Sequence, residues 1–185
     1  MTQPKPKLKF TVHDYMSTPG DKRYQLLDGE MILAPSPTDN HQRIVANLFR
    51  LLDLFVSSEL LGRVRLAPLD VVLSENDVVQ PDVMFVSNAR SEIITEANVQ
   101  GAPDLVAEVI SPGTAEFDRG YKRVLYARHG VREYWLVDPE TESVEVMVLG
   151  AEGLQTHGVY GSSGELSSPL MESLSLDLNE LFHRA

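Results

Sequence analysis

The chain has 185 residues, a formal net charge of −11 at pH 7 and no cysteine. The absence of cysteine excludes disulfide scaffolds, zinc ribbons, iron–sulfur sites and thiol catalysis. With 43% hydrophobic and 23% charged residues, the composition is that of a folded globular domain. The excess of acidic residues repels phosphate backbones at long range, so avid nonspecific nucleic-acid binding is not expected.

Neither a membrane span nor a signal peptide is predicted. Every long apolar run is interrupted by Glu, Asp or Arg before it reaches the roughly 20 residues that a membrane-spanning helix needs. The lysines within residues 1–9 are not followed by the apolar stretch of a signal peptide. We therefore expect a cytoplasmic protein, with a flexible N-terminus over residues 1–10 and a single domain over residues 11–185.

The first predicted elements are a short helix and a β-hairpin. Thr11 can cap a helix that extends through Met16. Tyr24–Leu27 and Glu30–Leu33 are strand-like segments separated only by Asp28-Gly29, a dipeptide that readily adopts the positive φ angles of a tight hairpin turn.

A long amphipathic helix is expected after the hairpin. From Thr38 or Asp39 to Leu61, apolar residues recur with the three–four spacing of one buried helical face, and Gly62 ends the helix. Three strand-like segments follow, Arg63–Ala67, Leu69–Leu73 and Val78–Val86.

The second half of the chain predicts a parallel crossover. After a polar segment over residues 87–102, Leu105–Ile110 is largely apolar on both faces, which is typical of a central, covered strand. Residues 111–114 turn the chain into a helix of about four turns that ends near His129-Gly130, and the strand Glu133–Val137 follows. Strand, helix and strand in this order predict a parallel pair. We expect an α/β or α+β fold: a central mixed β-sheet flanked by helices, with a C-terminal antiparallel extension that ends in a short helix.

Two acidic residues lie where apolar residues are expected. Glu108 shares one face of its strand with two apolar residues, and Asp82 does the same in the segment before it. An ionised carboxylate in a covered strand costs several kcal/mol unless something compensates it. Asp70, within Leu69–Leu73, is a weaker third case.

Each acid alone is most simply explained by an arginine partner or by a hydrogen bond to the backbone. Two acids on neighbouring core strands instead favour a bound cation, because like charges held close together raise each other's pKa unless a cation lies between them. Carboxylate oxygens suit Mg²⁺, Mn²⁺ or Ca²⁺. Glu30, at the exit of the hairpin turn, is either a further ligand or an ordinary turn-flanking residue.

Lys122 adds a cation near these acids. It lies in the first turns of the helix after the Glu108 strand, close to where open α/β sheets bind their ligands, and at the edge of an apolar stripe formed by Phe117, Tyr121, Val124 and Leu125. The alternative is a simple helix pair with Asp118, worth a few tenths of a kcal/mol. Beside a metal site, a lysine can orient an attacking water or stabilise the charge of a phosphorane.

Several short motifs occur in a fixed order between about Tyr24 and Asp138. They are residues 24–30 (YQLLDGE), Ser36-Pro37 followed by His41, residues 80–83 (QPDV), residues 103–112 (PDLVAEVISP), Asp118 with Lys122 and Tyr126, and residues 130–138 (GVREYWLVD). Each motif is weak alone. In this order they resemble the PD-(D/E)XK phosphodiesterase superfamily and, more closely, its bacterial family of putative restriction endonucleases.

The resemblance implies a central mixed sheet flanked by helices, with acids gathered at a Mg²⁺ or Mn²⁺ centre. Asp82 and Glu108 match the two acids of the motif, Glu30 matches the early glutamate, and Asp70 is at most a residue that supports the ligands. The chain also departs from the motif.

The first departure concerns the lysine of the motif. Ile110 stands where that lysine is expected, two residues after the acid, and Lys122 on the next helix fits the role instead. The second departure is Gln25, which stands where relatives often have an acid.

These observations predict a metal-dependent endonuclease that hydrolyses DNA phosphodiester bonds, is weakly active in isolation and forms a homodimer. Asp82, Glu108 and Glu30 are the expected metal ligands and, with Lys122, the expected catalytic residues. The residues expected to bind substrate are Arg119, Arg123 and His41. One rival is a catalytically inactive dimeric scaffold, in which arginines pair with the acids. Another is a hydrolase of a smaller phosphodiester, with a narrow pocket and no basic surface beside it.

Overall fold

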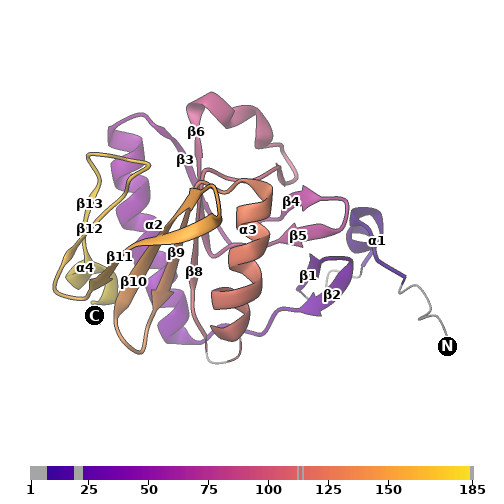
Figure 1. Cartoon of the computed structure of the whole chain (residues 1–185), viewed down its shortest axis with the longest axis horizontal. Helices are drawn as coiled ribbons and strands as arrows, with labels where there is room; N and C mark the ends of the chain where they lie inside the picture. Colours follow the sequence, from indigo (N-terminus) through magenta and orange to yellow (C-terminus); the bar gives the residue numbers. More distant parts are fainter. Residues whose placement is uncertain (1–7, 19–22, 112, 114, 184–185) are drawn as a thin grey trace.

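The computed structural model describes residues 8–18, 23–111, 113 and 115–183, and two β-sheets dominate it (Figure 1). The larger sheet contains, in spatial order, β11 (Gly153–Gly161), β10 (Ser143–Gly150), β9 (Glu133–Asp138), β8 (Leu105–Val109), β6 (Val83–Ser87) and β3 (Gly62–Leu66). Within it, β8 and β9 are parallel and the other pairs are antiparallel. The predicted mixed sheet and its central parallel pair are therefore confirmed.

The smaller sheet contains the predicted hairpin. Its strands, in spatial order, are β2 (Glu30–Leu33), β1 (Tyr24–Leu27), β5 (Asp77–Val79), β4 (Val71–Ser74) and β7 (Val99–Gln100). The short helix α1 (Val12–Met16) lies beside this sheet (Figure 1), and Thr11 caps it as expected. Residues 1–7 of the expected flexible N-terminus lie outside the described residues, whereas Phe10 donates its backbone N–H to Gly29.

Helices cover both faces of the larger sheet. The long helix α2 (Asp39–Ser58), which Thr38 caps, packs on one face, and α3 (Arg123–His129) lies on the other (Figure 1). The side chains of β8 alternate between these two layers, since Leu105 and Ala107 pack in the core with α2 and Val106 packs in the core with α3. Glu108 follows the same alternation and therefore faces the α3 side of the sheet.

The C-terminal region forms the expected antiparallel extension. β10 and β11 make a long hairpin, and a second hairpin pairs β12 (Glu165–Ser167) with β13 (Ser175–Asp177). The chain ends in the short helix α4 (Leu178–Phe182), whose buried residues join the core beneath α2. No helix among the described residues is long and apolar enough to cross a membrane.

The segment Val78–Val86 is not the single strand that its apolar pattern predicts. It divides into β5 and β6, which belong to different sheets. Pro81 has no backbone N–H to donate to a sheet ladder, so it interrupts the strand. The connection over Gln80–Asp82 carries the chain from one sheet to the other, and Asp82 precedes β6 instead of lying within a strand. The segment over residues 87–102 also contains structure, a 3₁₀ helix η1 (Asn88–Ile93) and β7.

The helix after β8 differs from the regular helix that the sequence predicts. A π-helical turn, η2 (Phe117–Lys122), precedes α3. Asp118 and Lys122 are buried beside the predicted apolar stripe. Leu125 of that stripe is buried and Phe117 and Tyr121 pack against the same core, whereas Val124 is 68% exposed. Two positions of the turn expected over residues 111–114, namely 112 and 114, lie outside the described residues.

Candidate active site

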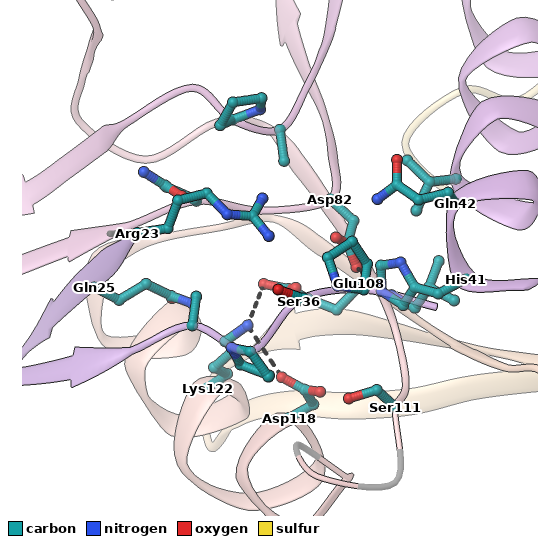
Figure 2. Close-up of a pocket in the computed structure, with 18 residues that line it drawn as sticks. Arg23, Gln25, Ser36, His41, Gln42, Asp82, Glu108, Ser111, Asp118 and Lys122 are labelled. Atoms are coloured by element: carbon teal, nitrogen blue, oxygen red, sulfur yellow. Dashed lines mark hydrogen bonds and ion pairs between the residues drawn. The ribbon is translucent and has the colours of Figure 1, made fainter. Parts of the chain in front are cut away.

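The register between β6 and β8 brings the two predicted acids together. The strands are antiparallel and pair Val83 with Ala107 and Met84 with Val106. Extension of this register by one residue places Asp82 opposite Glu108, where Cβ atoms lie about 4.5–5.5 Å apart. Both acids line a cleft of about 150 Å³ between the hairpin, α2 and η2 (Figure 2).

Glu108 is a buried carboxylate with two strong partners. Its side chain is 5% exposed, and the same oxygen, Oε1, lies 2.9 Å from Lys122 Nζ and accepts a 2.5 Å hydrogen bond from the Tyr126 hydroxyl. Burial raises the pKa of Glu108 to about 7; Lys122 opposes this shift, and the charge of Asp82 adds to it. The two acids therefore repel each other across the cleft, as expected for carboxylates that could share a cation.

Lys122 lies between two carboxylates. Its Nζ is 2.9 Å from Glu108 Oε1 and 3.0 Å from Asp118 Oδ1, and its side chain is 6% exposed. Burial alone lowers the pKa of a lysine, but the attraction of these two acids outweighs it and raises the pKa of Lys122 above its ordinary value. Lys122 is therefore an ammonium at neutral pH, which suits electrostatic stabilisation and not proton abstraction.

The π turn aligns the residues that reach these acids. Asp118, Lys122 and Tyr126 are spaced four residues apart, and in a regular α-helix each such step advances about 40° around the axis. A π turn has more residues per turn, so it offsets this drift between Asp118 and Lys122. The three side chains form one column, the 118–122–126 column, on the side of the helix that contacts Glu108.

Asp82 is held from the other side of the cleft. Its Oδ2 accepts a 2.8 Å hydrogen bond from the backbone N–H of Val109 and lies 3.2 Å from His41 Nε2. His41 is placed here because it lies in the first turn of α2. Burial lowers the pKa of His41, but its contact with Asp82 raises the pKa by more than burial lowers it, so the net shift is upward. The expected approach of His41 to the site is thus seen, with Asp82 as its partner.

Residues of the hairpin form a wall of the cleft that sequence reasoning did not assign. Arg23 and Gln25 both line the cleft, and the guanidinium of Arg23 extends over it (Figure 2). No ion pair joins Arg23 to any other described residue. The resemblance already drew attention to position 25, because Gln25 stands where relatives often have an acid. Nothing in the sequence around Arg23 indicated a place in the site.

Glu30 and Asp70 lie apart from the two central acids. Glu30 is exposed and pairs with Leu27 at the turn end of the hairpin, whereas the cleft adjoins the other end, at Arg23 and Gln25. Asp70 accepts hydrogen bonds from the Tyr15 hydroxyl and from Gln80 Nε2, each 2.8 Å long. It therefore touches the cleft only through Gln80.

The basic residues around Lys122 mostly anchor other parts of the fold. Arg123 donates from Nε and Nη2 to the carbonyl of Leu154, at 2.9 and 2.6 Å, so the structure does not bring it to the cleft. Arg119 forms a 2.7 Å ion pair with Asp138. It lines a neighbouring hollow that shares His41 with the cleft. Arg119 thus lies at the rim of the cleft, in the adjoining hollow, and not beside Asp82 and Glu108.

The donor set fits a hard divalent cation. Within the part of the chain that the structure describes, no group of three or more His, Cys, Asp or Glu side chains is arranged to hold a metal ion. Mg²⁺, however, commonly binds through one or two carboxylates and takes its other ligands from water and substrate phosphate. Asp82 and Glu108 would be the two carboxylates that hold such an ion.

A mixed sheet with one acid just before a strand, a second acid on the adjacent strand and a lysine from the next helix defines a restriction endonuclease-like protein. The family model described as "Putative restriction endonuclease" (Uma2) matches residues 12–179, and the chain belongs to this family. It is 27% identical over 126 residues to an uncharacterized protein, sll1609, of Synechocystis sp.; the match covers 67% of this chain and 71% of that protein.

The fold also has a counterpart among solved structures. A crystal structure of a putative nuclease belonging to DUF820 from Anabaena variabilis superimposes with a TM-score of 0.78. The match covers 94% of this chain and 97% of that chain at 20% sequence identity. At this level of identity the likeness establishes a shared fold.

Proposed function

We propose that this protein is a metal-dependent endonuclease that hydrolyses phosphodiester bonds of DNA. The observation that carries the proposal is that Asp82, Glu108 and Lys122 line one cleft, from the residue before β6, from β8 and from the helix after β8. Family membership supports nuclease activity. The contacts of the three side chains support the particular roles given below.

Each residue has a role that follows from its surroundings. A Mg²⁺ or Mn²⁺ ion held by Asp82 and Glu108 would supply positive charge to the scissile phosphate and a more acidic water. Lys122, kept charged by its two acidic neighbours, stabilises the negative charge that develops on the phosphorus oxygens. Arg23 binds a phosphate on the opposite wall, since its guanidinium is not committed to an acid of the described chain.

The partners of the acids favour an enzyme over an inactive scaffold. The scaffold function requires arginines that neutralise Asp82 and Glu108, whereas their partners within the described chain are Lys122, Tyr126, His41 and the Val109 N–H. The net charge of −11 predicts weak affinity for DNA in isolation. A homodimer stays a prediction, which sedimentation analysis can test.

The proposal is tested by calorimetric titration of Mn²⁺ and by a plasmid-nicking assay at low salt. Wild type should bind Mn²⁺ and nick, Asp82→Ala should do neither, and Glu165→Ala should behave as wild type because Glu165 is an exposed residue of β12 and does not line the cleft. Full nicking by Asp82→Ala would refute the mechanism. Hydrolysis of bis(p-nitrophenyl) phosphate without nicking would instead favour a smaller phosphodiester substrate.

A further inference from the structure

Tyr126 contacts the site and has no role in the mechanism described above. It is fully buried in α3, its hydroxyl lies 2.5 Å from Glu108 Oε1, and its ring makes an edge contact with Tyr134 at a centroid distance of 5.1 Å. A buried tyrosine hydroxyl needs a hydrogen-bond partner, and here that partner is one of the two proposed metal ligands.

The donors to each acid share a pattern. Lys122 and Tyr126 both approach Oε1 of Glu108, and neither uses Oε2. Just before β6, Oδ2 of Asp82 is approached by both the Val109 N–H and His41. Each carboxylate is thus held through one oxygen by two protein groups, which fixes the plane of the carboxylate and leaves its second oxygen to other ligands.

We infer that Tyr126 is a positioning residue: its hydroxyl holds the Glu108 carboxylate in the orientation that binds the divalent cation. The inference rests on the proposed function, because it assigns Tyr126 a part in that same cation site. Groups that hydrogen-bond to metal ligands orient them, and their removal typically costs 10–100-fold in metal affinity or activity. The π turn matters here too, since Tyr126 completes the 118–122–126 column.

The test compares two conservative variants by calorimetric titration of Mn²⁺. Tyr126→Phe removes only the hydroxyl that contacts Glu108. Tyr134→Phe is the matched control, because it removes an equally buried hydroxyl of the same aromatic pair, one that donates to the backbone carbonyl of Asp118 at 3.1 Å. We expect the Mn²⁺ dissociation constant to rise about 10–100-fold in Tyr126→Phe and to stay within about twofold of wild type in Tyr134→Phe.

A nicking assay over a range of Mn²⁺ concentrations supplies a second readout. Activity of Tyr126→Phe should recover as Mn²⁺ is raised, because the defect is one of affinity. Unchanged Mn²⁺ affinity in Tyr126→Phe, or equal weakening in both variants, would overturn the role of Tyr126 and leave the proposed nuclease in place. Absence of Mn²⁺ binding by wild type would overturn both.

Discussion

Replacement of Lys122 by Met should reveal how strongly the buried ion pairs support the fold. The substitution keeps an unbranched side chain one atom shorter and removes the ammonium that lies within 3.0 Å of Glu108 and Asp118, both less than 6% exposed. Removal of one partner from a buried pair costs about 3–5 kcal/mol, which is a large share of the roughly 5–15 kcal/mol that stabilises a typical domain. For a chain of this size, that loss lowers the melting temperature by about 6–20 °C.

The loss of stability in Lys122→Met should increase as the pH rises. Without Lys122, the pKa of Glu108 rises further above its ordinary value of 4.5, because the cation opposes the effect of burial. An acid with a raised pKa in the folded state stabilises the fold at low pH and loses that contribution as pH rises through the folded pKa. The part of the difference from wild type that comes from Glu108 should therefore appear above about pH 7, where Glu108 ionises in the wild type but not in the variant, and grow toward pH 8.

Thermal unfolding at pH 5 and pH 8, followed by circular dichroism, measures both effects. Arg50→Met is the matched control, because its pair with Glu180 is 3.2 Å long but both side chains are 56% exposed. Exposed pairs are worth about 0–1 kcal/mol, so this control should melt within about 4 °C of wild type. If Lys122→Met melts as wild type does at pH 8, the reasoning about the buried ion pairs is wrong.

Two further predictions concern Arg23 and Asp77. Arg23→Ala should weaken DNA binding and reduce the slope of log K against log salt by about 1, measured by fluorescence anisotropy; an equal change in Arg63→Ala, an exposed residue on β3, would argue against a specific phosphate contact. Burial raises the pKa of Asp77, but hydrogen bonds from the Asp28 N–H and Ser74, together with Arg128, outweigh it and the net pKa is lowered. Its contribution to stability is therefore present above its ordinary value of 3.8 and is lost as pH falls through the lowered pKa. Asp77→Asn should melt below wild type at pH 7, and the two melting curves should converge in more acidic buffer; a constant difference would count against this assignment.

The placement of the central acids could be read from the sequence because it depends on strand alternation. Alternation within each segment put Asp82 and Glu108 among apolar neighbours, and in the structure the antiparallel register of β6 and β8 sets them opposite each other. The same local logic holds for the hairpin, whose tight turn forms at Asp28-Gly29 as predicted.

Other parts of the site depend on information that local patterns do not contain. The turn chemistry at Asp28-Gly29 identifies the hairpin but not which of its ends adjoins the cleft, so Glu30 was expected near the acids where the structure places Arg23 and Gln25 instead. Arg123 was expected near the phosphate because it is close to Lys122 in sequence, yet its guanidinium satisfies a carbonyl of β11. A long side chain can reach several different partners, and which partner it contacts depends on the tertiary structure.

The π turn has an evolutionary consequence. The turn holds one residue more than a regular helical turn, and deletion of one residue between Asp118 and Lys122 would restore the regular α-helix. Asp118 and Lys122 would then be three residues apart, and a three-residue step in an α-helix falls about 60° short of a full turn, so their 3.0 Å ion pair would have to form in a different geometry. A descendant with that deletion would keep Asp82, Glu108 and Lys122 but hold Lys122 differently, so members of the lineage with altered activity should be sought by helix length as well as by residue identity.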